Sequence, residues 1–217
     1  MGFFSKWFGG EEQPQVTKIT HPKQLKQGDV INFSDNFALP ELIRKQSYQV
    51  NQVNTYQFEH KVINEFVLLG GHNQQVFMSV ESDDEEWLNL SIKVNRNQVG
   101  QLFDLEQFAE VFEEEVQPEL ALQQQTPELN NWLAPVYFRQ TYAQRGYFYQ
   151  KDFRPSKPAL EEDDDSEAFD YFCLTSADDS YSVEIEVWSD GDTDVLLTIH
   201  RPLADIVDMY PGADSEQ

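Results

Sequence analysis

The sequence predicts an α+β, β-rich protein with two antiparallel β units, a central helix and short terminal helices. Most of the chain consists of short segments in which apolar and polar residues alternate, which is the period of a half-buried strand. In one segment Leu88, Leu90 and Ile92 alternate with Asn89 and Ser91. Because little helix separates these segments, we expect antiparallel pairing rather than the crossovers of a parallel sheet.

The first β unit is expected over residues 21–125. Its predicted strands are Asp29–Phe33, Ser47–Phe58, Val62–Leu69, Gln75–Glu81 and Trp87–Asn95. Glycines separate some of these segments: Gly28 precedes the first strand, and Gly70-Gly71 lies between the third and the fourth.

The central helix is predicted to follow Asp104. This residue can cap the first turn, with Gln107 three residues later as in a capping box. Apolar residues then recur at helical spacing, at Leu105, Phe108, Val111 and Phe112. Pro118 limits the helix, because proline cannot continue the hydrogen-bond ladder.

The second β unit, strongly acidic, is expected over residues 126–217. Its predicted strands are Pro135–Tyr142, Gly146–Asp152, Phe169–Ser176, Ser180–Ser189 and Asp194–His200. A short helix is predicted over Pro202–Met209, since proline suits a first helical turn. Residues 154–166 combine two prolines with a run of acids, which is typical of a loop.

The two β units echo each other in sequence. When the chain is shifted by 107 residues (183 − 76), Val76 meets Val183 and Leu90 meets Leu197. An internal duplication explains these matches. Alternating hairpins also produce such matches by chance, so both explanations stay open.

Residues 1–20 form an apolar N-terminal segment and a linker. Within residues 1–8, a helix would place four aromatic side chains on one broad face: Phe3, Phe4, Trp7 and Phe8. Such a face suits peripheral contact with a membrane surface or a partner groove. Docking on the protein's own core, or fraying, is the alternative.

The charge of the chain excludes some partners. The 39 Asp+Glu outnumber the 15 Lys+Arg, giving a net charge of −24. Such a field repels nucleic acid and favours a basic or membrane-associated protein partner. A single cysteine, Cys173, and the lack of a long apolar run predict a cytoplasmic protein.

No motif predicts a catalytic residue, a cofactor or zinc. The acids Asp190, Asp192 and Asp194 resemble the first half of a calcium loop. Val195 and Arg201 stand where that loop needs glycine and glutamate, so a solvated hairpin turn is favoured over a calcium site.

Aromatic residues offer candidate interaction sites. Tyr147 and Tyr149 lie in an aromatic-rich stretch with Arg145, and such residues carry many interface hot spots. The alternative is that these rings face the protein's own core.

Three short strings resemble the YjfK-like family of bacterial proteins. They are the start Met1–Gly9, the Leu25-x-x-Gly28-Asp29 opening and the ending Trp188–Asp194. The resemblance spans nearly the whole chain and implies a gene neighbourhood rather than a reaction. Such genes tend to lie beside a phage-shock-type membrane coat protein, a small multi-pass membrane protein and a ligase resembling glutathionylspermidine synthase. The family defines no catalytic residues that could be transferred to this chain.

Two functions are therefore expected. The preferred one is a non-enzymatic cytoplasmic adaptor linked to a membrane-stress system of the phage-shock type. The alternative is an accessory subunit or enzyme of polyamine or peptide ligation that binds a polycationic substrate. Acids that converge in a cleft with shifted pKa values would favour the alternative. A mimic of DNA, with acids in rows on one face, is a third hypothesis.

Overall fold

The computed structural model describes residues 18–71, 75–82, 85–156 and 166–212. Its strands form one antiparallel sheet in the order β11-β1-β2-β3-β4-β5-β10-β9-β8-β7-β6. The strands are β1 (Val30–Phe33), β2 (Ser47–Phe58), β3 (Val62–Leu69), β4 (Gln75–Ser82), β5 (Glu86–Val94), β6 (Glu119–Ala121), β7 (Val136–Tyr149), β8 (Glu167–Thr175), β9 (Tyr181–Trp188), β10 (Thr193–Pro202) and β11 (Ile206–Tyr210). The β-rich, antiparallel character predicted from alternation is thereby confirmed.

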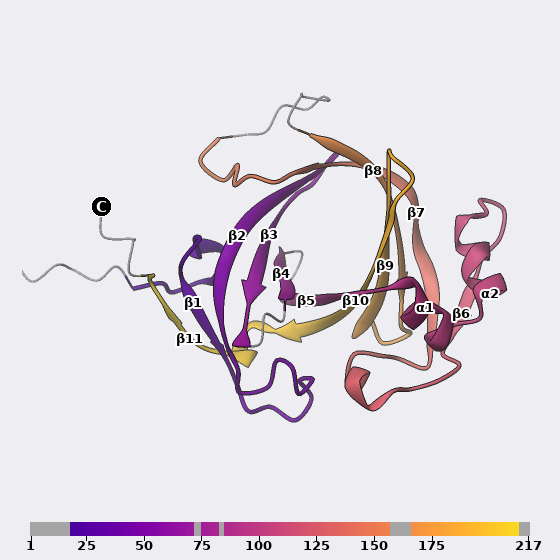
Figure 1. The fold of residues 1–217 in the computed structure, drawn as a ribbon. Helices are drawn as coiled ribbons and strands as arrows, with labels where there is room; N and C mark the ends of the chain where they lie inside the picture. The colour runs from indigo at the N-terminus through magenta and orange to yellow at the C-terminus, as the bar shows by residue number, and fades with distance from the viewer. Residues whose placement is uncertain (1–17, 72–74, 83–84, 157–165, 213–217) are drawn as a thin grey trace, which may run out of the picture.

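One additional pairing closes part of this sheet on itself. The end of β2 pairs with the end of β7, from Thr55 opposite Tyr149 to Phe58 opposite Gly146. Strands β2, β3, β4, β5, β10, β9, β8 and β7 therefore form a continuous ring, here called the closed sheet. Figure 1 shows these strands curving around a common centre. The remaining strands extend it: β1 and β11 beyond β2, and β6 beyond β7.

Alternation gives each strand of the closed sheet two different faces. In β9, Val183 and Ile185 are fully buried in the apolar core, while Ser182, Glu184 and Glu186 point to the opposite face. The core face packs against the short helices and against the loops between strands. The opposite face is the inside of the closed sheet, because side chains from all of its strands meet in one cavity there.

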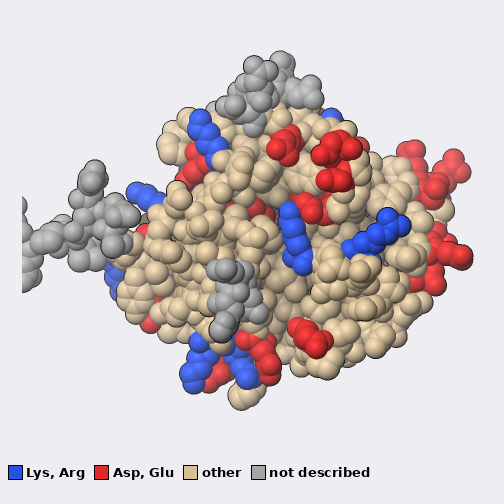
Figure 2. Space-filling model, viewed as in Figure 1, with Lys and Arg blue, Asp and Glu red and all other residues tan. Residues whose placement is uncertain are grey.

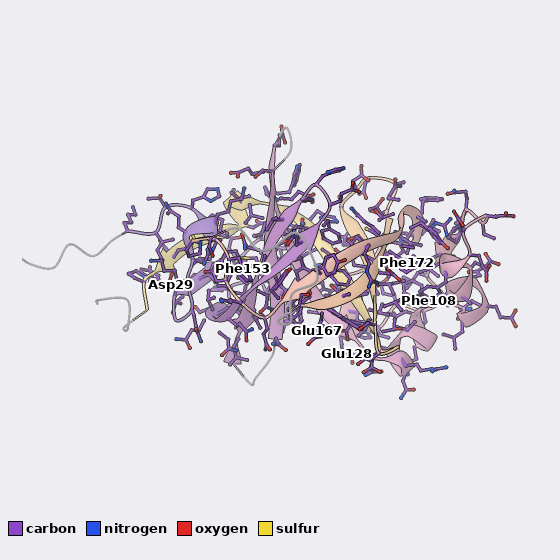
Figure 3. All side chains as sticks on the ribbon, turned by 90° about the horizontal axis from the view of Figure 1, so that it is seen from above. Asp29, Phe108, Glu128, Phe153, Glu167 and Phe172 are labelled. Carbon is purple, nitrogen blue, oxygen red and sulfur yellow. The ribbon has the colours of Figure 1, made fainter. Side chains whose placement is uncertain are left out.

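Two short α-helices cover part of the core face. They are α1 (Arg96–Leu102) and α2 (Leu105–Ala109), continued by the 3₁₀ turn η3 (Glu110–Phe112). Asn95 and Gln98 form a capping box on α1, and Asp104 caps α2 as predicted. The helical turns thus span the predicted apolar positions from Leu105 to Phe112, but as a five-residue α-helix followed by a 3₁₀ turn rather than as one continuous α-helix. Figure 3 shows Phe108 and Phe172 at this end of the molecule, opposite Asp29 and Phe153.

Further 3₁₀ turns lie before β1 and between later strands of the described residues. They are η1 (Pro22–Gln24), η4 (Pro127–Leu129) and η5 (Leu203–Asp205). The helix predicted over Pro202–Met209 is wrong beyond η5, because residues from Ile206 onward form β11 and pair with β1. The open edge of β1 supplies hydrogen-bond partners that a short helix would lack. The predicted N-terminal helix lies outside the described residues.

Strand β7 replaces two predicted strands. The expected break over residues 143–145 is a bulged region of one continuous strand, with register shifts between Arg139 and Gln144. Ala143 has a φ of 44° there, in the left-handed region that non-glycine residues rarely adopt. The irregularity detected in the sequence is therefore a bend within the strand rather than its end.

The two expected β units contribute to the same sheet. The boundary at residues 125 and 126 falls between β6 and β7, and the units pair with each other through β5–β10 and β2–β7. The register of the β3–β4 pair also corresponds to that of the β8–β9 pair. Phe66 lies opposite Met78 in β3–β4, as Phe172 lies opposite Ile185 in β8–β9.

Candidate ligand-binding site

A cavity of about 290 Å³ lies inside the closed sheet. Each of the eight strands contributes to its wall, for example through Tyr56, Glu65, Ser79, Ser91, Gln144, Tyr171, Glu186 and Leu196. Such a volume is just below the lower end of typical ligand pockets, about 300 Å³, and suits a small molecule. The wall mixes aromatic, hydroxyl and carboxyl groups rather than apolar side chains alone.

Two glutamates are buried in this wall. Glu65 on β3 is 8% exposed and accepts a hydrogen bond from Asn54 Nδ2 at 2.8 Å. Glu186 on β9 is 5% exposed, and its Oε2 has no hydrogen-bond partner among the described residues. A buried polar atom without a partner is rare in native proteins and calls for an explanation, such as a bound group.

Burial changes the acidity of both carboxyl groups. It raises the pKa of Glu65 to about 7, with Asn54 and Lys93 acting in the opposite direction. Burial, together with the nearby charge of Glu65, raises the pKa of Glu186 to about 8. Near neutral pH, each of the two carboxyl groups is therefore protonated in part of the molecules, and a bound cation could displace that proton.

A third glutamate, Glu184, lies two residues before Glu186 on β9. Glu184 accepts a hydrogen bond from the Tyr171 hydroxyl at 3.0 Å and another from Ser182 Oγ at 3.1 Å. Burial and the charge of Glu184 hold the pKa of Tyr171 well above its ordinary value. The phenol therefore stays protonated and able to donate.

Tyr56 and Phe58 line the cavity near the β2–β7 seam and pack against the buried ring of Phe169. The ring of Phe169 lies 5.5 Å from that of Tyr56 and 5.7 Å from that of Phe58, centre to centre. Gly146 sits against them in the seam: a Cβ there would lie 2.4 Å from the Phe169 ring. This close packing allows β2 and β7 to pair and provides apolar surface beside the carboxyl groups.

The cavity opens toward an acidic mouth. Glu81, which binds Lys61 Nζ, and His200 line both the cavity and an adjoining surface pocket. That pocket is also lined by Glu85, Asp178 and Asp179. Figure 2 shows both acidic and basic side chains near the centre of the face viewed, and further acidic ones along the outer edge near α2. The approach to the cavity thus carries negative charge that attracts cations.

His200 belongs to a hydrogen-bonded chain at this mouth. Its Nδ1 lies 2.8 Å from Asn89 Oδ1, and its Nε2 lies 3.1 Å from Ser182 Oγ. These contacts fix the imidazole between β5 and β9 and leave it little freedom to turn toward a ligand.

Lysine contributes positive charge near the cavity without neutralising it. Lys93 Nζ lies 2.7 Å from Asp194 Oδ2 and 5.4 Å from the centre of the Phe77 ring. Lys61 pairs with Glu81. Neither lysine forms a salt bridge with Glu65, Glu184 or Glu186, and among the described residues no other base does either.

The candidate calcium ligands lie in the hairpin turn between β9 and β10. Gly191 has a φ of 94°, and Asp190 Oδ1 accepts a hydrogen bond from the Asp192 amide at 3.0 Å. Asp194 is occupied by Lys93 and by Trp188 Nε1 at 3.1 Å. Over the part of the chain that the structure describes, no three His, Cys, Asp or Glu gather as a metal site.

The predicted interaction residues differ in how far the structure buries them. Tyr149 is 1% exposed and packs on Phe153, so the expectation that its ring lies on the surface is wrong. Tyr147 is half-buried, with Arg145 over its ring at 5.9 Å. The N-terminal aromatics Phe3, Phe4, Trp7 and Phe8 lie outside the described residues.

Sequence reasoning missed the acidic interior. Its signal was present in β9, where Ser182, Glu184 and Glu186 alternate with apolar residues. An acid on the polar face of a strand is ordinarily solvated, so alternation alone indicated a surface.

No helix in the described part of the chain is long and apolar enough to cross a membrane. No family model, curated protein or solved structure matches the chain.

Proposed function

We propose that this protein binds a small organic cation bearing a primary ammonium group inside the closed sheet. The observation that carries the proposal is Glu186, a buried carboxyl group in the cavity wall whose Oε2 has no hydrogen-bond partner among the described residues. An ammonium group offers both the positive charge and the N–H donor that this oxygen needs.

The chemistry of the wall favours an amine over other cations. A quaternary ammonium group has no N–H to donate, so it would leave Oε2 unpaired. The rings of Tyr56 and Phe58 provide a surface for hydrocarbon and for cation–π contact. The small volume of the cavity favours a short aliphatic chain.

The alternative expected from the sequence, a protein that binds a polycation, is supported by this site. The feature named to distinguish it was acids that converge in a cleft with shifted pKa values, and Glu65 and Glu186 have that character. Their raised pKa values also suit reversible binding, because an incoming ammonium displaces a proton rather than an existing ion pair.

Isothermal titration calorimetry tests this function. At pH 8.5 and low salt, n-butylamine and 1,4-diaminobutane are titrated into the wild-type chain and into Glu186→Gln. We expect saturable binding that weakens about tenfold or more in the variant, as loss of a charge-assisted hydrogen bond requires. Glu119→Gln, an exposed site with the same charge change, serves as the control. Absence of binding by every amine, or binding indifferent to Glu186→Gln, would overturn the proposal.

The adaptor function stays a second proposal. The acidic mouth residues Glu85, Asp178 and Asp179 give it a surface that a basic partner could contact. Affinity purification at low salt, with and without residues 1–10, tests it. Recovery of a membrane-associated partner that depends on the aromatic start supports the adaptor. Recovery of no partner in either case contradicts it.

We also infer that the two halves of the closed sheet arose by duplication. Support comes from one register: Phe66 lies opposite Met78 as Phe172 lies opposite Ile185, at offsets of 106 (172 − 66) and 107 (185 − 78) positions. The next hairpins differ by two residues, because Met78 lies opposite Leu90 whereas Ile185 lies opposite Val195. Ser91 and Thr198, also 107 apart, lie opposite each other in β5–β10 with their hydroxyls 2.8 Å apart. An experimental structure in which the two sets superpose best in another register would contradict this inference.

A further inference from the structure

We infer that the ligand is a linear diamine whose two ammonium groups are held by Glu186 and Glu184. This inference rests on the proposed function and specifies its substrate class. It starts from the observation that two carboxyl groups on one strand face the same cavity.

The spacing of the two carboxyl groups is set by the strand. Residues two apart on one face of an antiparallel strand are separated by about 7 Å. Strand β9 is held on both sides, by β8 and by β10, from Val183 to Val187. The Cα atoms of Glu184 and Glu186 are therefore held at a nearly constant distance, and the carboxyl groups move around it only as far as their side chains allow.

Both glutamates have capacity for another donor. A carboxylate has about four lone-pair sites, and the hydroxyls of Tyr171 and Ser182 occupy two of those of Glu184. Glu186 Oε2 accepts no hydrogen bond from the described residues, so its lone pairs are available. One ammonium group can therefore bind at each residue without displacing an existing hydrogen bond.

The length of a short diamine matches this spacing. In 1,4-diaminobutane five single bonds of about 1.5 Å, at tetrahedral angles, separate the nitrogens by about 6 Å. The five-carbon homologue is slightly longer, and the side chains of Glu184 and Glu186 can adjust for either. Two carbons are too few to reach both carboxyl groups.

The space between the two sites is partly apolar. The rings of Phe58 and Tyr171, which line the cavity, lie 5.6 Å apart, centre to centre. Methylene groups can pack on such rings while the ends of the ligand remain paired. A single ammonium would leave either Glu184 or Glu186 without its cation, because Lys61 and Lys93 are bound to other acids.

The test compares two amines of the same chain length, which differ in the second ammonium group, with a shorter diamine. Titration calorimetry at pH 8.5 measures n-butylamine, 1,4-diaminobutane and 1,2-diaminoethane on the wild-type protein, on Glu184→Gln and on the control Glu119→Gln. We expect 1,4-diaminobutane to bind about tenfold or more tightly than either other amine. Glu184→Gln should remove that advantage, whereas the control Glu119→Gln should keep it.

The outcomes separate the inference from the proposed function. If n-butylamine binds the wild-type chain as tightly as 1,4-diaminobutane, the diamine inference fails and the amine site stands. If Glu184→Gln leaves the diamine advantage intact, the inference also fails. If no amine binds, both fail. A far-ultraviolet circular dichroism spectrum and a urea midpoint like those of the wild type show that Glu184→Gln is folded.

Discussion

At the residue scale, the interior of the closed sheet is defined by carboxyl groups that water scarcely reaches. Glu65 has a hydrogen-bond donor in Asn54, whereas one oxygen of Glu186 has none among the described residues. Retaining such a group costs stability unless it is protonated or bound to a cation. Its presence at this position is therefore better explained by binding than by folding.

The raised pKa values predict how stability changes with pH. The folded chain holds protons on Glu65 and Glu186 up to about pH 7 and 8, whereas the unfolded chain loses them near the ordinary pKa of 4.5. Stability from the protonated forms is full below that ordinary value and is lost as pH rises through the folded values. Glu186→Gln removes one such group.

The measurement is urea unfolding of the wild type and Glu186→Gln at pH 5.5, 7 and 8.5. The free energy of unfolding of the variant, relative to wild type, should rise across this range by an amount on the order of 3 kcal/mol. Glu119→Gln should show no such trend, because its side chain is exposed. A flat difference for Glu186→Gln would contradict the burial of its charge.

A second residue prediction concerns Cys173, whose thiol lines the cavity. Burial raises its pKa to about 12, so very little reactive thiolate exists at pH 8. Ellman's reagent should therefore react with the folded chain about a thousandfold more slowly than with the chain in 6 M guanidinium chloride, because an ordinary cysteine has a pKa near 8.5. Rates within tenfold of each other would show an open, solvated thiol.

At the element scale, the seam between β2 and β7 determines whether the sheet closes. It consists of only a few residue pairs, from Thr55–Tyr149 to Phe58–Gly146. The seam depends on close packing, since Gly146 lies directly against Phe169 and Phe58. Strand β9 depends less on such contacts, because long neighbours pair with it on both sides.

Gly146→Ala tests the seam. The added methyl group would overlap Phe169 and come within 2.9 Å of Phe58, so a ring or the backbone must move. We expect a loss of about 1–3 kcal/mol in the free energy of unfolding, as for overpacked cores, together with weaker amine binding. The matched control is Gly71→Ala, where nothing lies within 4 Å of the new Cβ. Equal stability of the two variants would contradict close packing at the seam.

At the scale of the whole molecule, the two halves share one sheet and one apolar core. β5 pairs with β10 from Trp87 to Val94, so neither half has its full set of strand partners alone. The core includes residues of both halves, such as Phe66 and Phe172. Unfolding of one half would expose the edge strand and core of the other.

We therefore expect a single cooperative unfolding transition. Far-ultraviolet circular dichroism and tryptophan fluorescence should give the same urea midpoint, because Trp132 and Trp188 belong to the same structure as the strands. Separate midpoints, or an intermediate with half of the strand signal, would indicate two independently stable units.

The local elements could be predicted from short stretches of sequence. Alternation and glycine turns placed β2 at Ser47–Phe58 and β3 at Val62–Leu69, the bounds that the structure has. Capping chemistry located the start of α2 after Asp104, and the acids near Gly191 were correctly favoured as a hairpin turn. These features depend on neighbours in sequence, so a single chain reveals them.

Tertiary structure alone decided the rest. Alternation gives a strand two faces without indicating which is enclosed, so the acids of β9 could be assigned inside only after β2 met β7 across about 90 residues (147 − 57). Pairing with β1 likewise made β11 a strand where local spacing favoured a helix. Closure of the sheet removed Glu186 from water, and that burial turned an ordinary acidic residue into a candidate ligand for an amine.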